Sequence, residues 1–176
     1  FVLMFCVHGN IWLALKTGEA LHHRAVALAK TLWLGQTLAA VAMLVLTAVY
    51  TNLYANYLAN PVLFVVPALA VCALLGVRLA LAAHKLVAAF ALSALHIISL
   101  TFFGLIGMFP NLYISSMDPS YSLGIHNAAS SPLTLTIMLV VVLVCIPVVI
   151  AYQVWVYSLF AYKVTIKDIH SAHHAY

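Results

Sequence analysis

Long runs of apolar residues, separated by short polar segments, constrain what this chain can fold into. The 176 residues are 66% hydrophobic and only 6% charged, whereas a soluble domain carries about 25% charged residues. A soluble protein needs charged side chains over its whole surface, and seven Lys and Arg with three Asp and Glu cannot supply them. The composition therefore predicts an all-α integral membrane protein that is covered largely by lipid.

Five apolar segments are candidates for transmembrane helices, each of which needs roughly 20 residues. The first begins at Phe1, inside the run FVLMFCV and without an initiating Met, and is too short to span the bilayer. We interpret it as the end of a helix whose start is missing, so that the sequence is expected to be a fragment. The expected helices cover about residues 1–15, 25–50, 61–83, 86–109 and 133–162.

One partial and four complete helices would form a four-helix bundle over residues 1–162, followed by a tail over residues 163–176. The connections are predicted to be a polar turn over residues 16–24, an interfacial turn with two tyrosines over residues 51–60, and a long polar connection over residues 111–132. Pro147 is expected to kink the last helix without ending it.

All seven basic residues fall on one side of the membrane if each segment crosses once. They are Lys16, Arg24, Lys30, Arg78, Lys85, Lys163 and Lys167. Because Lys and Arg are enriched in cytoplasmic loops, this distribution predicts a cytoplasmic tail and outward-facing turns at residues 51–60 and 111–132. The basic residues form no patch with interleaved aromatic residues, so no nucleic-acid partner is expected.

Polar side chains inside the apolar segments are the candidates for function. His8 and His96 lie at similar estimated depths, about 12 and 16 Å from the nearest basic boundary at 1.5 Å per residue. Two such histidines can ligate a b-type haem. The interpretation preferred here is that each neutral imidazole forms a hydrogen bond to a neighbouring helix.

Gln36 and Gln153 are candidates for a proton track or for contact with a quinone head group. An interhelical hydrogen bond explains either residue more simply. Aromatic residues such as Trp33 and Trp155 are interpreted as members of the aromatic belts near helix ends. The acids all fall in connections or in the tail, and the sequence shows no catalytic grouping.

The three cysteines have no CxxC or His/Cys ligand spacing, so we expect neither a disulfide nor a metal site and interpret them as small buried hydrophobic residues. They are Cys6, Cys72 and Cys145. The tail sequence HSAHHAY is rich in histidine, and we interpret it as a solvated tail in preference to a weak metal site.

Three stretches resemble subunit II of the cytochrome bd quinol oxidases. HGNIWLALKTGEALHHRA, residues 8–25, resembles the end of a helix and the turn after it in that family. FPNLYISSMDPSYSLGIHNAASSPLTLTIM, residues 109–138, is similar to the family's outer loop entering its last helix. PVVIAYQVWVYSLFAYKVTIKDI, residues 147–169, is similar to its C-terminal end.

The resemblance implies a subunit with two four-helix bundles, of which this chain would hold the end of the fourth helix and the second bundle. It implies a heterodimer in the bacterial cytoplasmic (inner) membrane that oxidises ubiquinol or menaquinol, reduces oxygen to water and generates a proton-motive force. Two b-type haems and one d-type haem are implied to belong to subunit I. This chain would be the structural partner, with no catalytic, cofactor-binding or metal residue of its own.

Two other classes of protein stay open from the sequence. A small polytopic transporter is expected to show broken helices and buried charges around a substrate site, and neither is evident here. A b-haem cytochrome would use His8 and His96.

Overall fold

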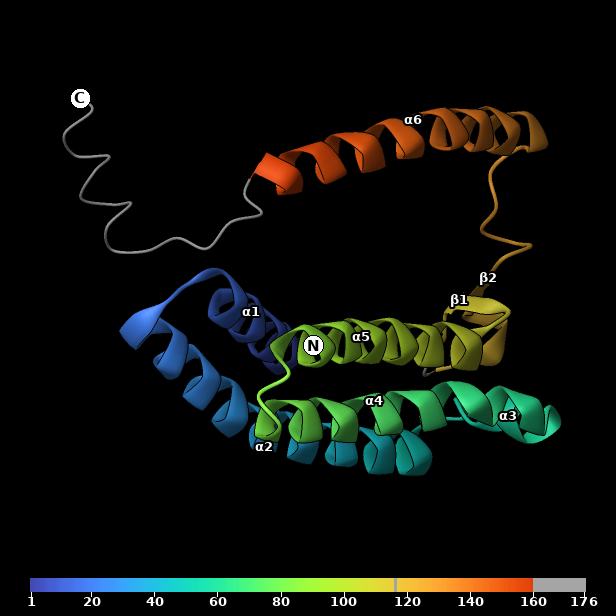
Figure 1. Ribbon diagram of the computed structural model, residues 1–176. Helices are drawn as coiled ribbons and strands as arrows, with labels where there is room; N and C mark the ends of the chain where they lie inside the picture. Colours follow the sequence, from blue (N-terminus) through green and yellow to red (C-terminus); the bar gives the residue numbers. More distant parts are fainter. Residues whose placement is uncertain (116, 160–176) are drawn as a thin grey trace. The chain divides into compact units, whose positions relative to one another are not determined.

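The computed structural model describes residues 1–115 and 117–159, except for the side chains of Glu19 and Pro119. The predicted tail over residues 163–176 therefore lies outside the described residues, as does the end of the last predicted helix. The described chain divides into two compact units, residues 1–108 and residues 109–159 (Figure 1).

The first unit begins with two helices joined by a two-residue turn. Helix α1 covers Val2–Lys16 and α2 covers Glu19–Tyr50. Helix α2 thus starts six residues before the predicted residue 25, and the polar segment EALHHR is helical. The reason is that Glu, Ala, Leu and Arg favour helix whether or not they are in lipid. The turn itself is restricted to Thr17 and Gly18, where the Thr17 hydroxyl donates to the Leu13 carbonyl at 2.7 Å.

A short helical segment then leads into a second pair of long helices. The predicted interfacial turn contains α3, Ala55–Ala59, followed by the 3-10 helix η1, Pro61–Phe64. Helices α4, Val65–Ala82, and α5, Leu86–Met108, follow. The turn between them contains His84, whose φ of 57° lies in the left-handed region. Pro110 cannot continue α5, because it lacks the N–H that a further turn would use.

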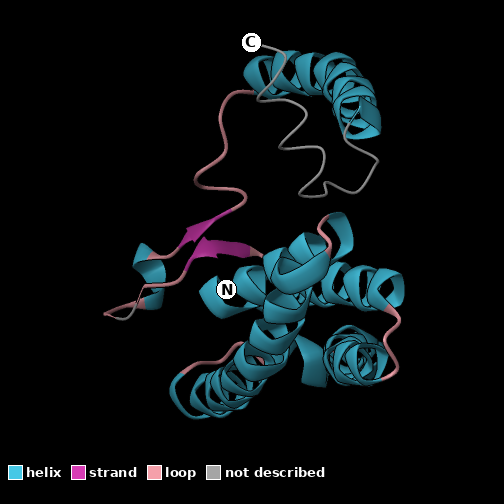
Figure 2. Cartoon of the chain, turned by 60° about the vertical axis from the view of Figure 1, so that its left-hand side comes forward, coloured by secondary structure: helices cyan, strands magenta, loops and turns pink. Residues whose placement is uncertain are grey.

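Helices α1, α2, α4 and α5 pack together in this unit, with close pairings of α4 with α5, α1 with α2, and α1 with α5 (Figure 2). The core cluster combines large side chains with alanines that let the backbones approach. It contains Val7, Ile11, Ala29, Trp33, Leu74, Val77, Ala80, Leu81 and Ala89.

The second unit consists of a small hairpin and one long helix. Strands β1, Asn111–Tyr113, and β2, Leu123–Gly124, pair antiparallel on either side of the 3-10 helix η2, Pro119–Tyr121. Helix α6 covers Pro132–Leu159 and continues through Pro147. The predicted polar connection therefore has its own hydrogen-bonded structure.

Four helical stretches of the described chain are long and apolar enough to cross a membrane: Ala20–Tyr50, Pro61–Ala82, Leu86–Met108 and Pro132–Leu159. Helix α1 is apolar but has only 15 residues. The prediction of an all-α membrane protein is confirmed.

The prediction that the cysteines are buried is wrong. Cys6, Cys72 and Cys145 are free and exposed in the units that contain them. An apolar residue needs no burial inside the protein when lipid is the solvent, so its hydrophobicity does not tell the inner face of a helix from the outer one.

Candidate functional site

The buried polar residues of the first unit form the candidate site. Among the described residues these are Gln36 on α2 and Ser93, His96 and Ser99 on α5, each no more than 7% exposed. The three residues on α5 are spaced three apart, and neighbours at this spacing share one face of a helix. This face therefore carries a polar stripe into an otherwise apolar core.

His8 of α1 forms a hydrogen bond with this stripe. Its Nδ1 lies 2.7 Å from the Ser93 Oγ, and the Ser93 hydroxyl donates its single proton to the Phe90 carbonyl at 2.7 Å. A neutral His8 must therefore donate from Nδ1–H to Ser93, which leaves Nε2 unprotonated. The imidazole also stacks on the Phe90 ring at a centroid distance of 4.4 Å.

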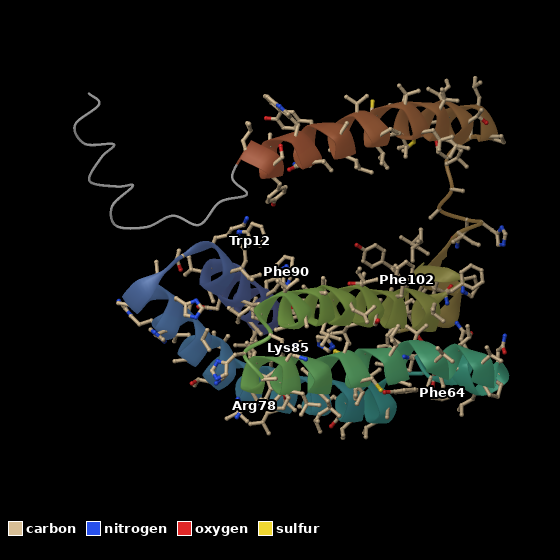
Figure 3. All side chains as sticks on the ribbon, in the orientation of Figure 1. Trp12, Phe64, Arg78, Lys85, Phe90 and Phe102 are labelled. Carbon is tan, nitrogen blue, oxygen red and sulfur yellow. The ribbon has the colours of Figure 1, made fainter. Side chains whose placement is uncertain are left out.

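The same seam between α1 and α5 contains a second aromatic contact. Trp12 lies one turn after His8, and its ring is 5.2 Å from that of Phe90 (Figure 3). The Lys16 ammonium lies 4.9 Å from the Trp12 ring centroid. His8 is thus one member of a packed row of side chains that holds α1 against α5.

His96 joins α5 to α4 instead. Its Nδ1 lies 2.8 Å from the Ala70 carbonyl oxygen, which can only accept, so Nδ1 carries the proton. The Nε2 atom is buried and has no hydrogen-bond partner among the described residues. His96 therefore has one satisfied interhelical hydrogen bond and one buried unprotonated nitrogen.

An apolar cavity of about 200 Å³ borders His96. Side chains of α2, α4 and α5 line it, including Thr37, Ala70, Leu100 and Phe103. His8 is not among the lining residues. The cavity therefore gives His8 and His96 no shared space in which a porphyrin could lie between them.

The structure places the two glutamines in different units. Gln36 is buried on α2, next to the cavity residue Thr37, and its Oε1 has no hydrogen-bond partner in the part of the chain that the structure describes. The interhelical hydrogen bond predicted for Gln36 is therefore not formed through this atom. Gln153 is exposed on α6. Trp33, predicted to be near a helix end, is buried in the middle of α2 and donates from Nε1 to the Leu74 carbonyl at 2.9 Å.

The sequence interpretation missed a second group of polar residues, on α3 at the opposite end of α5. The Tyr57 hydroxyl donates to the Phe103 carbonyl at 2.7 Å, and the Asn56 Nδ2 donates to the Ile106 carbonyl at 2.9 Å. Burial raises the pKa of the Tyr57 phenol, and the neighbouring Tyr54 raises it further. The signal available in the sequence was Pro110, which leaves the Ile106 carbonyl without its usual helical donor.

No group of three or more His, Cys, Asp or Glu side chains in the described part of the chain is placed to hold a metal ion. The site therefore consists of hydrogen bonds between helices, beside one apolar cavity.

Comparison with known proteins decides the family. The family model for cytochrome bd terminal oxidase subunit II matches residues 1–160. The chain belongs to the cytochrome bd terminal oxidase subunit II family. The resemblance inferred from the three sequence stretches is therefore confirmed.

Curated relatives of this family agree with the match. A probable cytochrome oxidase subunit 2 of Haemophilus influenzae is 31% identical over 88% of this chain and 48% of its own length. The cytochrome bd-I ubiquinol oxidase subunit 2 of Escherichia coli K12 is 32% identical over 68% of this chain and 32% of its own length. The cytochrome bd ubiquinol oxidase subunit 2 of Bacillus subtilis is 35% identical over 36% of this chain. The chain spans half or less of the length of these relatives.

Proposed function

We propose that this chain is part of the structural, haem-free subunit of a membrane-bound quinol:oxygen oxidoreductase. The match to the subunit II family over residues 1–160 carries the proposal. The names of the relatives from Escherichia coli and Bacillus subtilis describe ubiquinol oxidases, and we transfer that substrate class to the complex that contains this chain. We also propose that the oxidation of quinol by this complex is electrogenic.

The haems of the complex, two of b type and one of d type, are assigned to the partner subunit I. Geometry in this chain supports the assignment. His8 donates to Ser93 and stacks on Phe90, His96 donates to Ala70, and the two imidazoles do not line a common cavity. The two histidines therefore fit hydrogen bonding between helices better than they fit axial ligation of one iron.

Quinone binding by this bundle is the less favoured alternative. The cavity beside His96 is apolar, and the buried Nε2 of His96 and Oε1 of Gln36 are each covered by protein atoms. A quinone head group needs polar atoms that it can reach. This coverage favours a role for both side chains in packing.

A heterodimer in lipid follows from the proposal. Among the described residues, no atom lies within 4 Å of the position of a Cβ added to Gly104 of α5, whereas Gly107 packs against Leu53. Small residues permit close approach of two helices in a membrane. Gly104 is therefore the α5 glycine that is available to a partner helix.

The proposed location is the bacterial cytoplasmic membrane, with the tail in the cytoplasm. His8 contacts Ser93, and Trp12, further along α1, contacts Phe90, which is nearer the start of α5. Helix α1 is therefore antiparallel to α5, and its C-terminal end lies near the start of α5. This places Lys16 at the same end of the unit as Lys85. The position of Lys16 and Lys85 at one end of the unit supports the orientation predicted from the basic residues.

Co-purification tests the proposal. The full-length subunit, affinity-tagged and expressed at native level, is expected to bring down a membrane protein that contains haem, with quinol-dependent oxygen consumption. Recovery of the subunit as a stable, monodisperse homo-oligomer without a haem-bearing partner would contradict the proposal. Transport of a solute by the purified subunit alone would favour the transporter alternative.

A further inference from the structure

The buried ring of Trp33 on α2 contacts Arg78 of α4, and a second basic residue lies one turn before Trp33 on its own helix. The Trp33 Nε1 donates to the Leu74 carbonyl on α4, and the Arg78 guanidinium carbon lies 5.7 Å from the centroid of the Trp33 ring. Lys30 lies one turn before Trp33 on α2, and Arg78 lies one turn after Leu74 on α4. Because α2 and α4 are antiparallel, one turn back from Trp33 and one turn forward from Leu74 lead in the same direction. Lys30 and Arg78 therefore lie toward the same end of the unit.

Lys30 and Arg78 also mark the same depth in the membrane. After Lys30, residues 31–50 carry no charge. Such a stretch extends about 30 Å at 1.5 Å per residue, which is the thickness of the hydrocarbon core. On α4, the uncharged stretch from Pro61 ends at Arg78. The two cations are therefore expected where the hydrocarbon core meets the lipid head groups. Arg78 lies at the end of the unit that contains Lys85 (Figure 3).

No carboxylate of the described chain neutralises this pair. Arg78 contacts the face of Trp33, and neither Arg78 nor Lys30 has an ion pair with a described side chain. Glu19 lies 11 residues before Lys30 on the same helix, about 16 Å away along the axis. Both side chains are half-buried, where a charge is screened less than in water, so an anion that binds to them is attracted more strongly than at an exposed site.

The geometry points to a binding site for the phosphate group of an anionic phospholipid between α2 and α4, with Lys30 and Arg78 as its ligands. Arg presents a planar fork that binds phosphate through two hydrogen bonds, and Lys adds a point charge. Leu34 and Leu79 are exposed beside the two cations and offer apolar surface to the acyl chains. Basic pockets between transmembrane helices on the cytoplasmic side bind lipid head groups of this kind.

The site goes beyond the general preference of basic residues for the cytoplasmic side. That preference needs no particular placement of side chains, whereas here Arg78 of α4 lies against the Trp33 ring of α2 and Lys30 lies one turn before Trp33 on that helix. The site is also separate from the proposed oxidase function, because it would fix the lipid next to α2 and α4 whatever reaction the complex catalyses.

The test measures how anionic lipid stabilises the full-length subunit in its native complex. The complex is placed in nanodiscs of phosphatidylcholine with or without phosphatidylglycerol, and its melting temperature is recorded by intrinsic fluorescence. Phosphatidylglycerol is expected to raise the melting temperature of the wild type. In the double variant Lys30→Gln/Arg78→Gln the rise is expected to fall by about half or more, since two phosphate contacts are lost.

Matched variants separate this site from general surface charge. Arg24→Gln removes an exposed cation from the same helix and is expected to keep the full rise. Arg78→Lys keeps the charge but loses the planar fork, so it is expected to retain more of the rise than the double variant does. It guards against a folding defect in the double variant. The proposal is overturned if the double variant keeps the full rise, if Arg24→Gln loses as much as the double variant does, or if inorganic phosphate with phosphatidylcholine gives the same rise as phosphatidylglycerol.

Discussion

The Asn56 side chain on α3 takes the place of a backbone donor that α5 lacks: its Nδ2 lies 2.9 Å from the carbonyl oxygen of Ile106. In an unbroken helix this carbonyl would accept from the N–H four residues later, but residue 110 is proline and has none. The same amide lies 3.4 Å from the Gly107 carbonyl. One side chain therefore satisfies carbonyls at the end of a transmembrane helix, where water is scarce.

Substitution of Asn56 by Ala is expected to destabilise the subunit. A part-buried carbonyl at Ile106 would lose its donor, which costs about 1–3 kcal/mol. The melting temperature of the purified complex measures the effect. Asn60→Ala is the control, because the Asn60 side chain is exposed and forms no hydrogen bond with a described residue. Equal melting temperatures for Asn56→Ala and the wild type would contradict the assigned role.

The two glycines near the end of α5 are expected to respond differently to alanine. A Cβ on Gly107 would overlap the Leu53 side chain and lie 3.0 Å from the Leu53 backbone oxygen, so the α3 segment would have to shift. Such overpacking costs about 1–3 kcal/mol. We expect Gly107→Ala to lower the melting temperature of the complex.

Gly104→Ala is the matched variant, because no atom in the part of the chain that the structure describes lies within 4 Å of its added Cβ. It should leave folding of the subunit intact, and Gly104→Leu should weaken association with the partner if that face meets a helix of subunit I. Size-exclusion chromatography with haem absorbance measures the association. A Gly104→Leu subunit that stays fully associated would place the interface elsewhere.

Replacement of His8 or His96 by Ala is expected to leave the haem content of the complex unchanged. Each variant loses an interhelical hydrogen bond, worth about 0.5–1.5 kcal/mol, so a lower yield is expected. Pyridine haemochrome assay and reduced-minus-oxidised spectra measure the haem. Ser93→Ala removes the same bond as His8→Ala and serves as its control. Loss of one haem equivalent with the subunits still associated would show that a histidine is an axial ligand.

Labelling with a membrane-impermeant thiol reagent tests the proposed orientation. In a background without Cys6, Cys72 and Cys145, a cysteine at Ser122 is expected to react from outside the intact cell, since that connection should face outward. A cysteine at Ser171, in the tail outside the described residues, should react only after the membrane is opened. The reverse pattern would invert the topology.

The turn that contains Asp118 is expected to loosen in acid. The hydroxyl and backbone N–H of Ser120 both donate to the Asp118 carboxylate and hold its pKa below the ordinary value of 3.8. A group whose folded pKa is depressed stabilises the fold above its unfolded pKa, and that contribution disappears as pH falls through the folded pKa. Amide hydrogen exchange at Ser120, corrected for the intrinsic pH dependence of exchange, should therefore show constant protection from neutral pH to about pH 5 and less protection below the ordinary pKa.

Asp118→Asn should show weaker protection at neutral pH and no such pH dependence, because the amide has no charge to lose. Protection that falls equally in the wild type and in Asp118→Asn would assign the change to another group.

Much of this protein follows from its sequence alone. Helices must form wherever the chain crosses lipid, because only internal hydrogen bonds satisfy the backbone there. The helix predicted over residues 86–109 agrees with α5, Leu86–Met108, to within one residue. The helix predicted over residues 61–83 agrees with η1, Pro61–Phe64, followed by α4, Val65–Ala82. The loop and helix-end motifs also predicted the family, since shared hydrophobicity does not reproduce them.

The tertiary structure alone decided which face of each helix points inward. Apolar residues are equally suited to lipid and to the core, so the sequence could not show that Cys72 is exposed while Ala73 is buried. Nor could it show that His8 meets Ser93 while His96 turns to Ala70, because similar depth on two helices does not determine the direction of either imidazole. Those directions depend on how the helices rotate and pack, which is a property of the whole unit and not of any one segment.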